Sequence, residues 1–80
     1  MKSAEQMKAQ VLRLIQAYEN EYPDAETCIG RVVLDLLVPA DPDTVSHMDW
    51  QTGQKYTVGD LQPHLLEAAR EYADRLRARF

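Results

Sequence analysis

The sequence holds little cysteine, little glycine and no long apolar run, and each shortage excludes a class of protein. The single cysteine, Cys28, cannot form a disulfide within the chain or a cysteine-based zinc cage. The three glycines stand apart from one another, so there is no glycine-rich phosphate loop. The longest apolar stretch, from Val32 to Val38, is interrupted by Asp35 and is far shorter than the roughly 20 residues of a membrane span.

Length and composition indicate one small globular unit. The chain has 80 residues, of which 45% are hydrophobic and 28% charged. These are ordinary values for a folded protein rather than for a disordered tail or a fibre. We therefore expect a single compact domain over residues 1–80, because two domains need a longer chain.

Charge is distributed unevenly along the chain. The net charge is −4, and residues 19–60 alone hold nine acidic residues against Arg31 and Lys55. An acidic middle argues against general binding to nucleic acid, whose affinity comes largely from neutralised phosphates. It favours a larger protein partner with a basic surface. The polar N-terminus and the lone thiol predict a cytoplasmic location and no membrane association.

The first predicted element is an amphipathic helix. Apolar residues recur at steps of three and four along residues 7–22, which places them on one helical stripe. Ser3 and Gln6 form a capping-box pattern at its start, and Pro23 cannot continue it. The predicted helix therefore runs from residue 4 to residue 20 or 21. The residues of its stripe are Met7, Val11, Leu14, Ile15, Tyr18 and Tyr22.

Residues 24–38 are compatible with two structures. Asp24 can cap a helix in which pairs of apolar residues at 28/29, 32/33 and 36/37 share one broad face. The alternative is a strand over residues 31–38, because Gly30 costs a helix interior roughly 1 kcal/mol and adjacent valines favour strands. The paired spacing is the cleaner pattern, so we favour the helix.

A hairpin and a last helix follow the proline-rich segment 39–43. Residues 45–50 and 55–58 are strand-like, and Gly53 stands where a turn needs a positive φ. The last predicted helix starts near Asp60, with Thr57 or Asp60 as its cap and Pro63 in its first turn. Its apolar stripe runs from residue 61 to Phe80. Its outer face suggests ion pairs between Glu71 and Arg75 and between Arg70 and Asp74.

Few residues could carry metal binding or catalysis. His47 and Asp49 would lie on the same side of a strand, but one imidazole and one carboxylate make an incomplete metal shell. Cys28 falls on an apolar stripe, where a thiol behaves as a small hydrophobe. Ser3 is a predicted cap and Ser46 would point away from its neighbour His47, so no nucleophile has a base within reach. We expect no enzymatic activity, no metal and no cofactor.

The most suggestive side chains lie in the predicted hairpin and the loop before it. Trp50 has two interpretations, because its bulk could complete the core or anchor a partner, as tryptophan and tyrosine often do at binding hot spots. Met48 and Tyr56 would be its neighbours. The acidic loop, Asp41 to Asp43, together with Asp49 could steer a basic partner or simply be solvated. The candidate partner-binding residues are therefore Trp50, Tyr56, Met48, Asp49, Asp41 and Asp43.

Two short resemblances to known families lack the features that would identify the chain. The segment from Thr57 to Leu61 resembles the start of the last helix in some acyl carrier proteins, which are also small, acidic and helical. Those families attach their prosthetic group to a serine, and residues 30–35 contain none. Residues 45–76 resemble phage head–tail joining proteins in the order of their elements, but the segment 24–37 departs from that order.

We therefore expect a mainly α fold in the order helix, helix, β-hairpin, helix, with an α+β fold as the alternative if residues 31–38 form a third strand. The expected function is that of a small acidic regulator, inhibitor or assembly adaptor that binds a larger protein through the hairpin and the acidic loop. The alternative is a nucleic-acid-binding regulator that uses Arg70, Arg75, Arg77 and Arg79 of the last helix. A homodimer is also compatible with so small a core.

Overall fold

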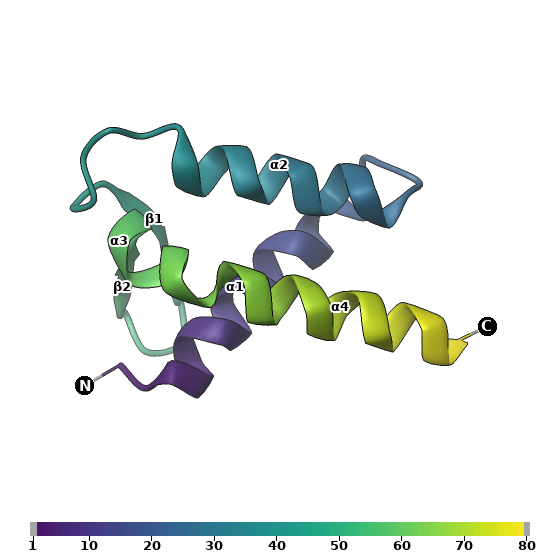
Figure 1. The fold of residues 1–80 in the computed structure, drawn as a ribbon. Coiled ribbons are helices and arrows are strands. Elements are labelled where there is room, and N and C mark those ends of the chain that lie inside the picture. The colour runs from purple at the N-terminus through teal and green to yellow at the C-terminus, as the bar shows by residue number, and fades with distance from the viewer. Residues whose placement is uncertain (1, 80) are drawn as a thin grey trace.

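A computed structural model describes residues 2–79, and it confirms a mainly helical domain with one two-stranded antiparallel hairpin (Figure 1). The hairpin lies between the second helix and the last helical segment, as predicted. No helix within the described residues is long and apolar enough to cross a membrane. In chain order the elements are α1 (Ala4–Tyr18), α2 (Ala25–Leu37), β1 (Val45–Met48), β2 (Lys55–Thr57), α3 (Val58–Leu61), the 3-10 turn η1 (Gln62–His64) and α4 (Leu65–Arg79).

The start of α1 follows the predicted capping box. The Gln6 backbone N–H donates to Ser3 Oγ at 3.1 Å, and the Ser3 N–H donates to Gln6 Oε1 at 2.8 Å. These bonds satisfy two of the donors that a helix start leaves without partners. The helix ends at Tyr18, slightly earlier than predicted, because the chain tightens into a turn before Pro23 in which the Tyr22 N–H still donates to the Tyr18 carbonyl.

Residues 25–37 form a helix, so the alternative strand over residues 31–38 is wrong. The Asp24 carboxylate caps α2 by accepting from the Thr27 N–H at 2.9 Å. The buried side chains of α2 are four residues apart, at Cys28, Val32 and Leu36, which is the spacing of one helical face. Burial of this face outweighs the unfavourable helix propensity of Gly30.

The hairpin is shorter than predicted and contains an irregularity. Val45 pairs with Thr57, whereas His47 pairs with Tyr56, so Ser46 is an extra residue in β1. Such a bulge turns the following side chains relative to the partner strand. The strands stop at Met48 and Lys55 because the Gly53 N–H donates to the Asp49 carbonyl at 2.7 Å and closes the turn. Gly53 has a φ of 72°, which is the conformation predicted for it.

The last helical segment is broken rather than continuous. It begins at Val58, with Thr57 as its cap and Asp60 as the reciprocal member of a capping box. Pro63 lies in η1, where its missing N–H and fixed φ fit a first turn but would disrupt a longer helix. The regular helix α4 therefore starts at Leu65, five residues after the predicted start near Asp60.

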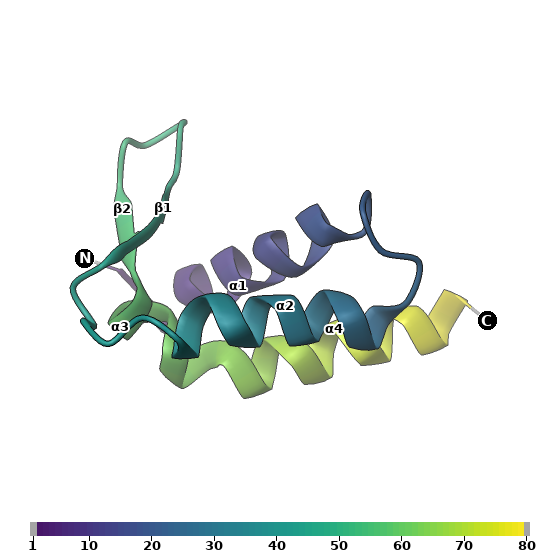
Figure 2. The same cartoon turned by 90° about the horizontal axis from the view of Figure 1, so that it is seen from above.

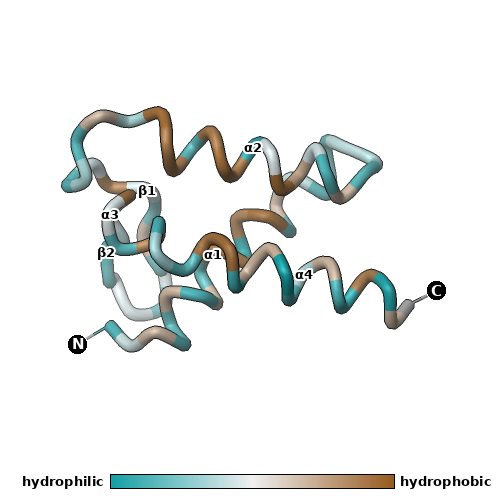
Figure 3. Tube along the Cα trace, in the orientation of Figure 1, coloured by the Kyte–Doolittle hydropathy of each residue, from teal (hydrophilic) through white to brown (hydrophobic). Residues whose placement is uncertain are grey.

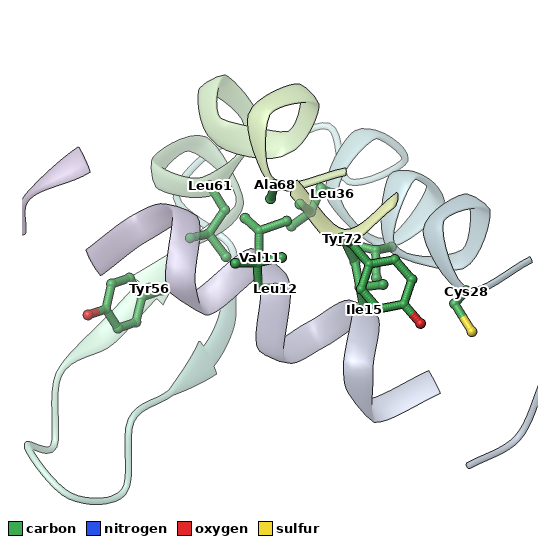
Figure 4. Close-up of a cluster of buried hydrophobic side chains, with 10 residues drawn as sticks. Val11, Leu12, Ile15, Cys28, Leu36, Tyr56, Leu61, Ala68 and Tyr72 are labelled. Carbon is green, nitrogen blue, oxygen red and sulfur yellow. The ribbon is translucent and has the colours of Figure 1, made fainter. Parts of the chain in front are cut away.

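The core forms where the apolar stripes of α1, α2 and α4 meet. Figure 4 shows Val11, Leu12 and Ile15 of α1 between the hairpin on one side and α2 and α4 on the other. Figure 3 shows that α2 is the most hydrophobic helix and that further hydrophobic positions lie along α1. The buried core cluster is Val11, Leu12, Ile15, Cys28, Val32, Leu36, Tyr56, Leu61, Ala68 and Tyr72.

One predicted ion pair on α4 is present and one is not. Glu71 and Arg75 approach to 3.7 Å, as expected for residues four apart. Asp74 pairs with Arg77 at 3.7 Å rather than with Arg70, so that prediction is wrong. Phe80, the last residue of the predicted stripe, lies outside the described residues.

Candidate partner-binding site

A groove lies between α1 and the turn end of the hairpin. Figure 2 shows the hairpin extending beyond the layer of helices, next to α1. The groove has a volume of about 430 Å³. It is lined by Gln10, Arg13 and Leu14 from α1 and by His47, Met48, Asp49, Trp50 and Gln51 from the hairpin.

His47 forms the inner wall of this groove. Its Nε2–H donates to Oε1 of the buried Gln10 at 2.7 Å, which ties β1 to α1. Its ring stacks on Tyr56 with 5.4 Å between centroids and 16° between planes. Its Nδ1 atom is buried and has no hydrogen-bond partner among the described residues. A buried polar atom without a partner is uncommon and needs an explanation.

The electrostatic environment keeps His47 neutral near pH 7. Burial lowers the pKa of His47 below its ordinary value, the positive charge of Arg13 lowers it further, and Asp49 partly opposes them. Since Nε2 carries the hydrogen that Gln10 accepts, the neutral ring leaves Nδ1 with a free lone pair. Because Nδ1 is buried, this acceptor is not open to a molecule in the groove.

Trp50 stands in the turn at the edge of the groove, and 87% of its surface is exposed. Its interpretation as a core residue is therefore wrong. The tight turn around it explains the exposure. Asp49 stabilises that turn through two hydrogen bonds. Its side-chain Oδ1 accepts from the Gln51 N–H at 2.9 Å, and its backbone carbonyl accepts from the Gly53 N–H. This geometry leaves the indole outside the helical core.

Asp49 and Met48 support the groove rather than project from it. Asp49 Oδ2 lies 3.9 Å from the Arg13 guanidinium, so this ion pair joins the hairpin turn to α1. Met48 is half-buried and contributes apolar surface to the groove wall. The structure thus brings together three of the six residues predicted to bind a partner, Trp50, Met48 and Asp49.

Tyr56 does not belong to this surface. Only 2% of it is exposed, and it is one of the largest fully buried side chains in the core. One face of its ring stacks on His47, and Lys2 Nζ lies 5.2 Å from the ring centroid. The expectation that Tyr56 contacts a partner directly is therefore corrected, because its bulk fills the space between the hairpin and α1.

Asp41 and Asp43 lie at the other end of the hairpin. They precede β1, whereas Trp50 follows it, and Figure 2 shows their loop beside α3. Asp41 Oδ1 accepts from the Asp43 N–H at 2.9 Å, and the Pro42 carbonyl accepts from the Gly59 N–H at 2.9 Å. The acidic loop is thus held against α3, and it does not line the groove that contains Trp50.

Five groove residues were absent from the sequence-based set of binding residues: Gln10, Arg13, Leu14, His47 and Gln51. Gln10 could have been noticed in the sequence, because it is a polar residue directly before Val11 of the apolar helical stripe, and both residues are buried. No feature of the sequence distinguishes Arg13 and Leu14 from the other residues of an amphipathic helix. His47 was considered only as a metal ligand.

A second, smaller hollow of about 230 Å³ lies where α1 ends and α2 begins, and Cys28 is part of its lining. Cys28 is buried, and burial raises its thiol pKa, with the charges of Glu19 and Asp24 acting in the same direction. A thiol with a raised pKa is a poor nucleophile. Among residues 2–79, no group of three or more histidine, cysteine or acidic side chains could hold a metal ion.

Comparison of the chain with protein-family models, with curated proteins and with solved structures finds no match in any of the three.

Proposed function

We propose that the protein is a non-enzymatic binding module that holds a segment of a larger protein in the groove between α1 and the hairpin. The observation that carries the proposal is the exposure of Trp50, 87%, at the edge of that groove. Tryptophan is enriched among the residues that dominate binding energy at protein interfaces, and here it stands at the edge of a groove.

The chemistry of the groove favours a segment with a bulky apolar side chain. Leu14, Met48 and the face of Trp50 offer apolar surface to such a side chain. Capture of the segment would then cover the indole.

The acidic charge of the chain has a separate role in this proposal. Residues 19–60 carry most of the negative charge, including the exposed Asp41 and Asp43. Clustered charge accelerates encounter with a partner of opposite sign without direct contact in the final complex. The partner is therefore expected to be basic around the segment that enters the groove. The buried, unpaired Cys28 fits a reducing compartment such as the cytoplasm.

The test uses two matched variants at exposed apolar residues. Trp50→Ala removes the proposed anchor, and Leu66→Ala truncates an exposed side chain on α4 that does not line the groove. Immobilised wild type and both variants are exposed to lysate, and the captured proteins are identified by mass spectrometry after circular dichroism has shown that each variant is folded. We expect a stoichiometric partner with wild type and Leu66→Ala, and a loss of at least tenfold with Trp50→Ala.

Tryptophan fluorescence gives an independent reading with the purified partner. Trp50 is the only tryptophan, so its emission should move to shorter wavelength when the partner covers it. A partner retained in full by Trp50→Ala, or an emission spectrum unchanged at saturation, would show that the groove is not the binding site.

The alternative, nucleic-acid binding through α4, has less support. Arg75 and Arg77 are both engaged with acidic residues of their own helix, Glu71 and Asp74. A gel shift at low salt separates the two functions, because binding through phosphates weakens steeply as salt rises.

A further inference from the structure

The His47 ring lies between the hairpin and α1 in surroundings that suit its neutral form. Its Nε2–H donates to Oε1 of Gln10, which is itself only 4% exposed. A second proton would have to bind Nδ1, which is buried and faces no acceptor among the described residues. A buried N–H without a partner loses its hydration and gains no hydrogen bond in return. Protonation of His47 therefore disfavours the closed arrangement of the hairpin on α1.

The charged groups around the ring add to this effect. Arg13 of α1 places a positive charge near the ring, and the opposing charge of Asp49 in the turn is already paired with Arg13 at 3.9 Å. Tyr56 of β2 covers one face of the ring with a neutral side chain, and Lys2 adds a cation 5.2 Å from the centroid of the Tyr56 ring. Burial and Arg13 accordingly lower the pKa of His47. The net effect of these neighbours opposes a second positive charge on the ring.

Of the elements in the fold, the hairpin can open with the least disturbance to the helices. Its two strands contact each other more than they contact any helix, and it extends beyond the helical layer (Figure 2). Its polar contacts with α1, among the described residues, are the His47–Gln10 hydrogen bond and the Arg13–Asp49 ion pair. Burial of Tyr56 holds the hairpin closed while His47 is neutral. A two-stranded hairpin without other contacts is marginally stable in water, so the detached hairpin would also fray.

We propose that the hairpin is a pH-sensitive switch that opens from α1 when His47 takes up a second ring proton. The buried Nδ1 is the sensor, because only water in the open state provides an acceptor for its proton. Histidine ordinarily titrates near 6.5, so lowering the pH from about 7.5 to about 5.5 should raise the equilibrium constant for opening by up to about tenfold. Opening separates the two walls of the groove and thus sets the fraction of molecules in which the groove exists.

Amide hydrogen exchange followed by NMR between about pH 5.5 and about pH 7.5 tests the opening without any partner, so the result does not depend on the proposed function. The Asp49 N–H, which donates to the Gln54 carbonyl at 2.9 Å, reports on the hairpin, and the N–H of Ile15 reports on the core of α1.

After correction for intrinsic exchange rates, Asp49 should be less protected than Ile15, and its protection should fall severalfold, by up to about tenfold, on acidification. About 0.5 M urea should accelerate exchange at Ile15 more than at Asp49, because global unfolding exposes more surface than opening of the hairpin does.

Two asparagine variants assign the effect to one histidine. His47→Asn removes the titrating ring and should abolish the pH dependence at Asp49, whereas His64→Asn changes a histidine of η1 outside the groove lining and should preserve it. The NMR titration of the His47 ring in wild type gives a reading without any substitution, and its midpoint should lie below about 6.5. A change at Asp49 of less than about twofold, a dependence that persists in His47→Asn, or equal protection of Asp49 and Ile15 in all conditions would each overturn the proposal.

Discussion

At the scale of single residues, the two large aromatic side chains of the hairpin have opposite environments. Trp50 is almost fully solvated at the turn, whereas Tyr56 is buried and stacks on His47. The difference follows from position, because Tyr56 lies in β2 beside α1 while Trp50 lies beyond the end of β1. The two residues should therefore affect stability and binding in opposite ways.

Alanine substitution of these two residues measures that difference. Tyr56→Ala should lower the free energy of unfolding by about 3 to 5 kcal/mol, the usual cost of removing a large buried aromatic ring. Trp50→Ala should change it by less than about 0.5 kcal/mol, as an exposed substitution does. Urea denaturation followed by circular dichroism gives both values. Equal losses in the two variants would contradict the environments described for them.

His47 should make the stability of the protein depend on pH between about 5.5 and 7.5. Its pKa is lowered in the folded protein by burial and by Arg13, whereas the unfolded chain titrates near the ordinary value of about 6.5. As the pH falls through 6.5, the unfolded state therefore takes up a proton that the folded state does not. The free energy of unfolding is expected to fall over this range.

Denaturation at several pH values in the same range checks this expectation. His47→Asn should flatten the dependence, whereas His64→Asn, which changes the other histidine of the chain, should preserve it. A wild type whose stability rises on acidification to pH 5.5 would show that the sign of the pKa shift is opposite to the one described.

At the scale of elements, two glycines in helices have different surroundings. Gly30 lies on an exposed part of α2, and a Cβ added there would meet no other atom within 4 Å. Gly59 lies in α3, and an added Cβ would be 3.0 Å from both Cβ and the carbonyl oxygen of Pro42. The loop after α2 therefore packs closely against Gly59 of α3 and leaves little room for a side chain there, whereas Gly30 has room for one.

Alanine at these two positions should therefore have opposite effects. Gly30→Ala is expected to raise the free energy of unfolding by about 0.5 to 1 kcal/mol, because alanine costs a helix less entropy. Gly59→Ala is expected to lower it by about 1 to 3 kcal/mol, since the loop must move away. Thermal and urea denaturation measure both effects. A stabilising Gly59→Ala would mean that the Pro42 loop does not pack on α3.

The ends of the helices were largely predictable from the sequence for a local reason. Ser3 with Gln6, Asp24 and Thr57 cap the helices that follow them, and each acts through residues no more than three positions away. The boundary between η1 and α4 was not predicted, because Pro63 can be accommodated in several ways at a helix start. Packing against α1 and α2 selects among them.

At the scale of the whole molecule, long-range bonds hold the elements in one arrangement. The Tyr72 hydroxyl of α4 donates to Glu19 beyond the end of α1, and Lys2 Nζ lies 2.6 Å from Asp60 Oδ2 at α3. Lys2 and the Thr57 N–H both stabilise the charged carboxylate and lower the pKa of Asp60. The Tyr72–Glu19 and Lys2–Asp60 contacts join residues more than 50 positions apart in the sequence, so they depend on the tertiary structure.

The sequence by itself determined the local structure of this protein. The periodic apolar residues and the caps specify the helices, and Gly53 with its flanking strands specifies the hairpin, because these signals act between residues close in the chain. Only the tertiary structure decided that Trp50 is exposed, that Tyr56 is buried, and that His47 meets Gln10 across 37 positions of sequence. Such contacts depend on how the hairpin packs on α1, and no pattern along the chain encodes that angle.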